Sequence, residues 1–597
     1  MSHVPDPAPR KPLRLWPGVA AAVLLLLTRF GLPLAMPEQF GLAILGGMVC
    51  ALAIVLWWLF FSRAPWPDRF GAIALMAAAL FATSRIIHVS LATGMMGLMF
   101  PIYAIPVLSV VFVAGAVVSQ RLPDRFRRAA MAAAILLGCG VFAVLRTNGI
   151  SLKGSDFAWR WSKTAEDRLL AQTVAEPPAL PVVPASLPVA PAASPAPPAM
   201  VPRVPEAPDT VAEWPGFRGP HRDGIVPGVR IKTDWAKSPP VQLWSRPIGP
   251  GWSSFAVSGG LLYTQEQRGS AEVVACYNET TGKPVWTHSD AARFWESNAG
   301  PGPRGTPTLS HGRVYTFGAT GILNALDART GAVVWSRNAA SDAAKKPPGW
   351  GFASSPLVVD DVVVVAAAGK LAAYDRATGK PRWFGPDGGD GYSSPQLFTI
   401  GGVPQILLMS GHGALSVAPA GGKVLWEYPW HSDTRIVQPA VTPDGDVLMI
   451  AMGAAGATGI RRISVAQGPG GWTPTERWTS AGLKPYFNDF VIHKGHAFGF
   501  DGSILACIDL TDGKRNWKGG RYGNGQLILL PEQDLLLVLS EDGELALVAA
   551  VPGEFKEIAR FPAIEGKTWN HPALAGDTLL VRNGQEMAAF RLSPAHL

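Results

Sequence analysis

The sequence predicts a bundle of five transmembrane helices followed by an all-β propeller of eight blades. Three observations support this fold class. Five apolar stretches precede residue 150, an eleven-residue motif ending in tryptophan recurs from residue 276 onward, and a shorter marker recurs eight times between residues 254 and 571. The two parts of the chain are therefore expected to fold by different rules, one set by lipid and the other by repetition.

The five apolar stretches each approach the roughly 20 residues that cross a hydrocarbon core of about 30 Å. They are Leu15–Leu34, Phe40–Phe61, Phe70–Val89, Leu98–Val118 and Ala129–Leu145. A cleaved signal peptide has a single short apolar run. We therefore expect residues 1–148 to form a multi-pass membrane anchor.

Basic residues gather at alternate ends of these stretches, and lysine and arginine are enriched in cytoplasmic loops. They are Arg10, Lys11 and Arg14 before the first stretch, Arg63 and Arg69 in the second loop, and Arg121, Arg125, Arg127 and Arg128 in the fourth. The pattern predicts a bacterial inner-membrane protein with a cytoplasmic N-terminus. Everything after the fifth span is then extracytoplasmic, in the periplasm.

Three ionisable residues, Arg29, Arg85 and His88, lie in or near the spans. Ionisable groups inside a membrane often mark functional sites, so a quinone or proton role is one interpretation. Each residue also lies near the end of a span, from which a side chain can reach the interface. We favour the second interpretation.

Two segments join the anchor to the propeller. Residues 149–173 include Trp159 and Trp161, which fit an interfacial aromatic belt. The stretch from Thr164 predicts a short amphipathic helix on the extracytoplasmic surface of the same membrane. Residues 174–213 contain 12 prolines in 40 positions. This composition favours polyproline II and predicts a spacer.

The eleven-residue motif A-x-D-x-x-T-G-x-x-x-W is intact at Ala325–Trp335 and Ala373–Trp383. Degenerate copies are Cys276–Trp286, Ser416–Trp426 and Cys507–Trp517. The Asp and Gly favour a turn between two strands. We expect each Trp to pack over a small residue of the neighbouring unit, and Cys276 and Cys507 to occupy that slot as buried structural residues.

The marker is a four-residue segment that precedes each unit. Its copies begin at Ser254, Thr306, Ser355, Ser394, Gln438, Asp489, Gln526 and His571, which are about 45 residues apart on average. Four short strands in about 45 residues are typical of a propeller blade. The residues from 214 to 597 therefore predict eight blades.

Ring closure is also predicted by the sequence. The segment Asn570–Leu592 lacks a Trp-bearing outer strand, whereas Val241–Pro247 is an outer strand without a blade. Joining the two completes the eighth blade and leaves no open sheet edge.

Charge excludes one class of partner. Residues 1–173 carry 16 Lys/Arg against 7 Asp/Glu, so the remaining 424 residues of this +8 chain are close to neutral. A nucleic-acid binder needs a basic stripe on its soluble domain, and no nucleic-acid partner is expected. Sequence signatures for haem, zinc-protease, serine-hydrolase and phosphate-loop sites are also absent.

The residues two before each marker are predicted to line one mouth of the central channel, where propellers commonly bind ligands. Together with neighbouring marker residues they give the candidate binding site Trp252, Arg304, Tyr392, Asn488, Asp489, Trp569, Asn570 and His571. Such an aromatic and polar ring could hold a small anion or a quinone-like ring. The alternative is that these residues shape the entry to each inner strand and satisfy turn amides.

The repeats resemble the Trp-docking repeats of pyrroloquinoline quinone (PQQ) propellers, a superfamily that includes quinoprotein dehydrogenases and the cofactor-free outer-membrane assembly lipoprotein B. The segment Trp214–Gly224 is similar to the opening signature of PQQ-binding-like repeat proteins, and Gly251–Ser254 and Gly499–Gly502 agree with it. The five-helix anchor resembles that of membrane-bound glucose dehydrogenase. This resemblance implies a quinoprotein-like fold.

The resemblance leaves two functions open. Quinoprotein dehydrogenases place adjacent cysteines over PQQ in many cases, and use Ca²⁺ ligands and a catalytic Asp set in long insertions. This chain has no Cys-Cys pair and nearly minimal blades. We therefore favour a membrane-tethered module that binds an envelope protein or small molecule, with no cofactor and no metal. The alternative is a PQQ-dependent oxidoreductase that passes electrons to membrane quinone.

Overall fold

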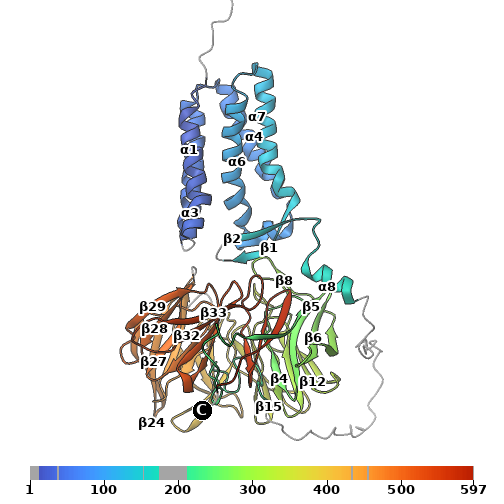
Figure 1. Ribbon diagram of the computed structural model, residues 1–597, viewed down its shortest axis with the longest axis vertical. Coiled ribbons are helices and arrows are strands. Elements are labelled where there is room, and N and C mark those ends of the chain that lie inside the picture. Colours follow the sequence, from blue (N-terminus) through green and yellow to red (C-terminus); the bar gives the residue numbers. More distant parts are fainter. Residues whose placement is uncertain are drawn as a thin grey trace, which may run out of the picture. The chain divides into compact units, whose positions relative to one another are not determined.

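A computed structural model describes residues 13–36, 39–151, 154–173, 212–431, 435–453 and 456–595. The chain divides into two compact units (Figure 1). One comprises Met1–Ser162 with Glu296–Gly300, and the other comprises Lys163–Trp295 with Pro301–Leu597. We call them the helical unit and the propeller unit.

The helical unit contains four continuous helical segments that are long and apolar enough to cross a membrane: Trp16–Ala35, Phe40–Phe61, Met99–Val118 and Asp124–Val144. Their elements are α1 (Trp16–Leu26), η1 (Leu27–Gly31) and α2 (Leu32–Ala35), then α3 (Phe40–Leu56) and η3 (Trp57–Phe61), then α6 (Met99–Val118), then α7 (Asp124–Gly140) and η5 (Val141–Val144). A count of five membrane spans is reached only if one bent pair of helices forms a single span. This pair is α4 (Trp66–Ser84) with α5 (Val89–Thr93) and η4 (Gly94–Gly97), which bends by 112°.

The basic ends of the helical unit meet at one end of the bundle. The Trp57 indole donates to the Arg14 carbonyl at 2.8 Å, which joins the start of α1 to the end of α3. Asp68, in the first turn of α4, forms ion pairs with Arg128 at 2.7 Å and with Arg127 at 3.5 Å, both in α7. The three ends that the sequence marks as basic are therefore neighbours.

Arg29 does not reach an interface, so the favoured interpretation was wrong for this residue. Its side chain is 3% exposed and packs against Gly47 of α3. The guanidinium lies 4.6 Å from the Tyr103 ring and 5.3 Å from the Phe40 ring. Arg85, in contrast, is exposed at the end of α4.

After α7 the chain forms a hairpin of β1 (Leu145–Ser151) and β2 (Gly154–Trp159), then the helix α8 (Ala165–Thr173). Thr164 and Asp167 cap α8 reciprocally, each side chain accepting from the other's backbone N–H at 2.8–2.9 Å. The helix forms as expected, but it packs on the propeller unit. Glu166 pairs with Arg293 at 2.7 and 2.9 Å, and one of its oxygens accepts from Gly269 N.

Residues 174–211, nearly all of the proline-rich linker, lie outside the described residues. The residues on either side of it, Thr173 and Ala212, belong to the same unit. In the described chain, the linker thus joins two parts of the propeller unit, and the change from one unit to the other falls at Ser162–Lys163.

Within the described residues, the propeller unit holds eight four-stranded antiparallel sheets, which confirms the predicted blade number. Blades 1 to 4 are β4 (Ala256–Ser258), β5 (Leu261–Arg268), β6 (Ala271–Asn278) and β7 (Pro284–Asp290); β10 (Thr308–Ser310), β11 (Arg313–Phe317), β12 (Ile322–Asp327) and β13 (Val333–Asn338); β14 (Leu357–Val359), β15 (Val362–Ala367), β16 (Lys370–Asp375) and β17 (Pro381–Phe384); β18 (Gln396–Ile400), β19 (Val403–Ser410), β20 (Gly413–Val417) and β21 (Val424–Pro429).

Blades 5 to 8 follow in the same order from inner to outer strand. They are β22 (Ala440–Val441), β23 (Val447–Gly453), β24 (Gly456–Gly468) and β25 (Gly471–Ser480); β26 (Phe490–His493), β27 (His496–Asp501), β28 (Ile504–Asp509) and β29 (Arg515–Arg521); β30 (Gln526–Leu530), β31 (Leu535–Leu539), β32 (Glu544–Ala549) and β33 (Glu557–Pro562); β34 (Ala573–Ala575), β35 (Thr578–Arg582), β36 (Glu586–Arg591) and β3 (Val241–Pro247).

Ring closure occurs as the sequence predicts. The early strand β3 pairs antiparallel with β36 and so supplies the outer strand of blade 8. Trp244 of β3 then donates its indole N–H to the Glu279 carbonyl of blade 1 at 2.7 Å. The two ends of the propeller sequence are therefore held in one sheet.

The docking tryptophans join most blades to the next one. Trp335 of blade 2, for example, donates to the Arg376 carbonyl of blade 3 at 3.0 Å, and its ring lies over Gly379. The small residue beneath Trp335 is thus the turn glycine of the next blade, and the same holds for Trp244, Trp286, Trp383 and Trp478. The expected slot for the cysteines was wrong, because Cys276 and Cys507 pair with the Trp of their own blade.

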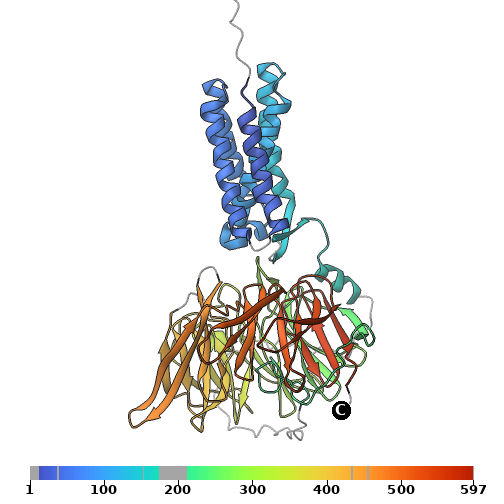
Figure 2. The same ribbon diagram turned by 60° about the vertical axis from the view of Figure 1, so that its left-hand side comes forward.

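Blade 5 departs from this pattern. Its outer strands β24 and β25 form a long hairpin that extends beyond the other blades (Figure 2). Trp426 of blade 4 finds no docking turn there, and its indole donates to Gln405 of its own blade at 2.8 Å.

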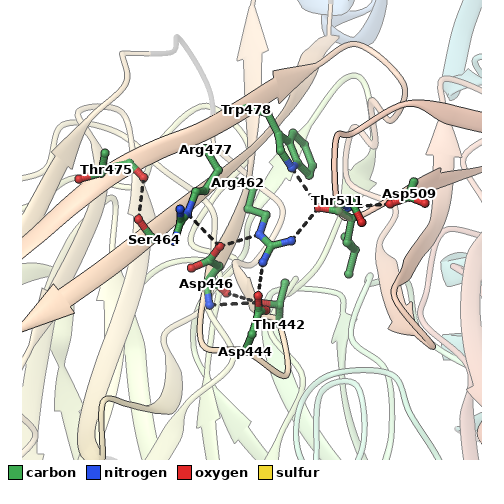
Figure 3. Close-up of polar contacts among 11 residues, drawn as sticks. Thr442, Asp444, Asp446, Arg462, Ser464, Thr475, Arg477, Trp478, Asp509 and Thr511 are labelled. Carbon is green, nitrogen blue, oxygen red and sulfur yellow. Dashed lines mark hydrogen bonds and ion pairs between the residues drawn. The ribbon is translucent and has the colours of Figure 1, made fainter.

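At the junction of blades 5 and 6, Trp478 lies over Gly513 in the usual way, and an ionic network adds to that contact (Figure 3). The Arg462 guanidinium pairs with Asp446 at 2.7 Å and with Asp444, and it donates to the Leu510 carbonyl of blade 6 at 2.7 Å. Trp478 donates to the same carbonyl at 3.0 Å. Blade 5 therefore keeps its contact with blade 6 although its turn motif is lost.

Candidate binding site at the channel mouth

Eight side chains, each two residues before a marker, form a ring at the end of the channel where the inner strands begin. We call this ring, with its adjoining loops, the channel mouth. All eight are half-buried: Trp252, Arg304, Ala353, Tyr392, Ile436, Phe487, Asn524 and Trp569. The eight first residues of the markers are all buried beneath them.

Aromatic rings meet across the channel mouth. The ring centroids are 4.8 Å apart for Trp252 and Trp569, 4.9 Å for Trp569 and Phe487, 5.4 Å for Phe487 and Tyr486, 6.3 Å for Tyr486 and Trp350, and 5.0 Å for Trp350 and Tyr392. The run joins blades 1, 8 and 6 to the loops before blades 3 and 4. It gives the mouth a nearly continuous aromatic floor.

One cation lies over this floor and a second lies beside it. The Lys567 ammonium is 4.1 Å from the Trp569 ring and 5.2 Å from the Trp252 ring, distances at which the ring quadrupole attracts a cation. Arg304 donates to the Trp350 carbonyl at 3.1 Å. Glu541 accepts from the Trp569 indole at 2.9 Å, which orients that ring.

The other four candidate residues lie beneath the mouth. Asn570 donates to the carbonyls of Gly251 and Ser253 at 3.2 and 2.7 Å, and Asn488 accepts from Tyr486 N at 2.7 Å. These contacts fix the backbone beside Trp252 and Tyr486. The two amides therefore position the aromatic floor from below.

Asp489 and His571 contact a segment that crosses the channel. Asp489 forms a buried ion pair with Arg218 at 3.1 Å, and burial outweighs that attraction and raises the pKa of the Asp489 carboxyl. His571 stacks on Trp214 at 6.4 Å between centroids. Burial lowers the pKa of His571 to about 3, so the imidazole is neutral at neutral pH.

We call Trp214–Val226 the channel segment. It contacts two of the predicted site residues, Asp489 and His571. The structure brings Trp252, Arg304, Tyr392 and Trp569 together at the mouth, and it places Asn488, Asp489, Asn570 and His571 below. Sequence reasoning missed Lys567, Tyr486 and Trp350. The signal was present, because each lies within five residues before a marker or beside a ring position.

The marker hydroxyls link neighbouring blades. The Thr306 hydroxyl accepts from Ser254 N, the Ser355 hydroxyl accepts from Thr306 N, and the Ser394 hydroxyl accepts from Ser355 N, all at 2.9–3.0 Å. These three hydroxyls therefore each satisfy the first amide of the marker of the preceding blade.

A planar cofactor does not fit between the mouth tryptophans. Aromatic rings in direct contact have centroids about 4.5–7 Å apart, and the Trp252 and Trp569 centroids are 4.8 Å apart, so these two rings contact each other with no ring between them. Within the described residues, no group of three or more His, Cys, Asp or Glu side chains is placed to hold a metal ion.

The comparisons with known proteins match the repeats of the propeller to those of two kinds of protein. A family model described as outer membrane protein assembly factor BamB matches residues 232–385 and 270–519. BamB of Yersinia pestis is 24% identical over 320 residues, which cover 51% of this chain and 69% of that protein. Quinohemoprotein alcohol dehydrogenase ADH-IIG of Pseudomonas putida is 29% identical over 182 residues, 29% of this chain and 24% of that protein.

Solved structures include the same kinds of protein. A europium-containing methanol dehydrogenase covers 62% of this chain and 96% of its own length at 12% identity, with a TM-score of 0.39. BamB from Moraxella catarrhalis covers 59% and 84% at 14% identity, with a TM-score of 0.30. The sequence matches confirm the expected repeat type, which BamB and quinoprotein alcohol dehydrogenases share.

Proposed function

We propose, because this propeller is built from BamB-type repeats, that the chain is a membrane-tethered scaffold that binds a protein partner in the cell envelope. The aromatic floor of the channel mouth carries the proposal. Trp, Tyr and Arg are the residue types most enriched among the residues that dominate protein interfaces. The mouth offers all three in one half-buried patch at Trp252, Tyr392, Trp569 and Arg304.

The partner surface should be acidic and apolar. Lys567 places a positive charge over half-buried rings, and Arg304 adds a second beside the Trp350 carbonyl. A carboxylate that approaches such a patch is attracted while the rings lose water. Asn488, Asp489, Asn570 and His571 act as positioning residues, because their contacts hold the loops that present the rings.

The membrane anchor is the second part of the proposal. Four helical segments are long and apolar enough to span, and a bent pair supplies a fifth. The basic helix ends meet at one end of the bundle, and basic ends are retained in the cytoplasm. We therefore place the N-terminus inside and the propeller in the periplasm of a bacterial inner membrane.

Site-specific photocrosslinking in cells tests the mouth. A benzoylphenylalanine at Asn524 or Ala353, two ring positions with small side chains, should give an adduct with an envelope protein. Combined Trp569→Ala and Arg304→Ala changes should reduce that adduct at least tenfold, because they remove an anchor ring and a cation. The propeller should stay folded, as judged by its melting temperature.

The matched control places the crosslinker on outer strands, at Val333 or Val424, which are 46% and 38% exposed. Those positions should give no such adduct. An adduct that forms equally from the outer strands, or that survives the double change at the mouth, contradicts the proposal.

Similarity to a quinohemoprotein alcohol dehydrogenase favours a second candidate, a PQQ-dependent oxidoreductase. The close packing of the mouth rings argues against it. Incubation of the full chain with PQQ and Ca²⁺ should give neither a bound-quinone absorbance nor dye-linked alcohol oxidation. Either signal would support the oxidoreductase instead of the scaffold.

A further inference from the structure

A cavity of about 600 Å³ lies at the other end of the channel, where the inner strands finish. The channel segment forms one wall through residues 215–223 and Ile225, and the inner strands of blades 2 to 6 form the others. Its volume falls within the range of about 300–1,000 Å³ of established ligand sites. The cavity is therefore large enough for a short stretch of peptide.

The channel segment shows how the inner strands accept another chain. Trp214 pairs with Val257 of blade 1, exchanging backbone hydrogen bonds of 3.1 and 2.7 Å. Leu309 N of blade 2 donates to the Pro215 carbonyl at 2.8 Å. Leu529 of blade 7 donates to Gly224 O at 2.8 Å and accepts from Val226 N at 2.9 Å.

These three contacts use one equivalent position. Val257, Leu309 and Leu529 are each the fourth residue of a marker, so the backbone at this position faces the channel. The equivalent residues of blades 3 to 6 are Val358, Leu397, Val441 and Ile492, and all four line the cavity. The cavity thus exposes four copies of a position that elsewhere binds an extended chain.

Blade 4 offers the most accessible copy. Leu397 is 40% exposed, whereas Val257 and Leu529 are both 0% exposed. The channel segment contacts this blade through a side chain, since Gln396 donates to the Arg222 carbonyl at 2.9 Å. In the described part of the chain, no backbone hydrogen bond joins the segment to β18.

Arginines keep the channel segment away from the remaining edges. Arg222 donates to the carbonyls of Pro356 and Ser355 in blade 3 at 2.8 and 3.1 Å, and Arg218 donates to the Phe490 carbonyl in blade 6 at 2.7 Å. At blades 3 and 6 the channel segment therefore makes its contacts through arginine side chains, whereas at blades 1, 2 and 7 it makes them through its backbone. Residues 396–399 of β18 line the cavity instead.

We propose that this cavity is a second binding site, which takes an extended peptide as an added strand on β18. Main-chain hydrogen bonds give such complexes their affinity, and alternate side chains enter pockets that give specificity. Leu397, Val358 and Val441 form an apolar wall. The peptide is therefore extended and carries apolar residues at alternate positions.

The full-length protein in detergent micelles tests this site. The probe is a fluorescent eight-residue peptide of alternating valine and threonine, and its affinity is measured by fluorescence anisotropy. The same peptide with every amide N-methylated keeps the side chains but cannot donate a backbone hydrogen bond. We expect N-methylation to weaken binding at least tenfold.

Leu397→Glu places a charge in the apolar wall and should also weaken binding at least tenfold. Val424→Glu is the matched control, because Val424 lies on the outer strand of the same blade and is 38% exposed. It should bind as the unchanged protein does. Arg304→Ala should bind normally too, so this site and the mouth can fail independently.

Three results overturn the proposal. The first is that the alternating peptide does not bind. The second is that the N-methylated peptide binds as tightly, which excludes strand addition. The third is that Leu397→Glu and Val424→Glu have equal effects, which places the peptide elsewhere.

Discussion

Glu272 illustrates how one buried carboxyl joins two blades. It lies on β6 of blade 1, is 4% exposed, and accepts from Ala319 N and the Thr320 hydroxyl of blade 2 at 3.0 and 3.1 Å. Asp290 lies directly opposite on the next strand. Burial raises the pKa of Glu272 to about 7. The hydrogen bonds lower this pKa and the Asp290 charge raises it, and both effects are weaker than that of burial.

This shift predicts a pH-dependent stability. Because the folded-state pKa exceeds the unfolded value, the folded protein binds more protons between about pH 4.5 and 7, and stability falls as pH rises through that window. At about 1.4 kcal/mol per pKa unit, the effect amounts to at most about 3 kcal/mol. Glu272→Gln should remove it, so the melting-temperature difference from the unchanged protein should shift between pH 5 and 8.

Glu554→Gln is the control for this measurement, because Glu554 is exposed. Its melting temperature should track that of the unchanged protein at every pH. A Glu272→Gln difference that stays constant from pH 5 to 8 would contradict the prediction, because Glu272 would then not titrate in that range.

The blade-to-blade element is a tryptophan stacked on a turn glycine. At Gly379 of blade 3, φ is +70° and a methyl group would lie 2.6 Å from the Trp335 ring of blade 2. At Gly402 of blade 4, φ is +78° and nothing lies within 4 Å of the same position. The two glycines share a left-handed backbone and differ in the docking contact.

Alanine substitution at both positions separates these two effects. Gly402→Ala should cost about 1 kcal/mol, because only the left-handed conformation is strained. Gly379→Ala should cost several kcal/mol, because the Trp335 ring must also move and lose its bond to the Arg376 carbonyl. Melting temperatures of the two variants give the comparison. Equal losses would mean that the tryptophan stack tolerates a methyl group and contributes little.

At the scale of the whole molecule, the helical unit is proposed to span the membrane and the propeller unit to lie outside the cytoplasm. A reporter fused after Leu597 tests this, since alkaline phosphatase folds only outside the cytoplasm and a green fluorescent protein folds inside. We expect active phosphatase and no fluorescence. Fusion after Arg121, in the basic loop before α7, is the control and should give the opposite result. Fluorescence from the fusion after Leu597 would contradict the proposed topology.

Much of this architecture could be predicted because repetition averages out local ambiguity. Eight markers about 45 residues apart fix the blade number even though only blades 2 and 3 carry the intact motif. The closing strand was identifiable because Val241–Pro247 has no blade of its own. Blade 5 was the exception, since the hairpin of β24 and β25 replaces a turn with extra strand length and leaves Trp426 without a turn to dock on.

The candidate site was predictable as a set of positions, and less so as a set of contacts. The spacing from each marker placed Trp252, Arg304, Tyr392 and Trp569 at one mouth. It could not show that Asp489 pairs with Arg218, 271 positions earlier in the chain, at 3.1 Å. Long-range partners depend on how the channel segment folds back through the ring.

By itself, the sequence determined the apolar helical segments, the eight blades and the closure of the ring, because hydropathy and periodicity act locally and recur. Only the tertiary structure decided that aromatic rings from five loops meet across the mouth. It also decided that α8 packs on blade 1 and that the channel segment pairs with some inner strands while the edge of β18 stays accessible. These features arise from contacts between residues that are distant in the chain, which no local pattern encodes.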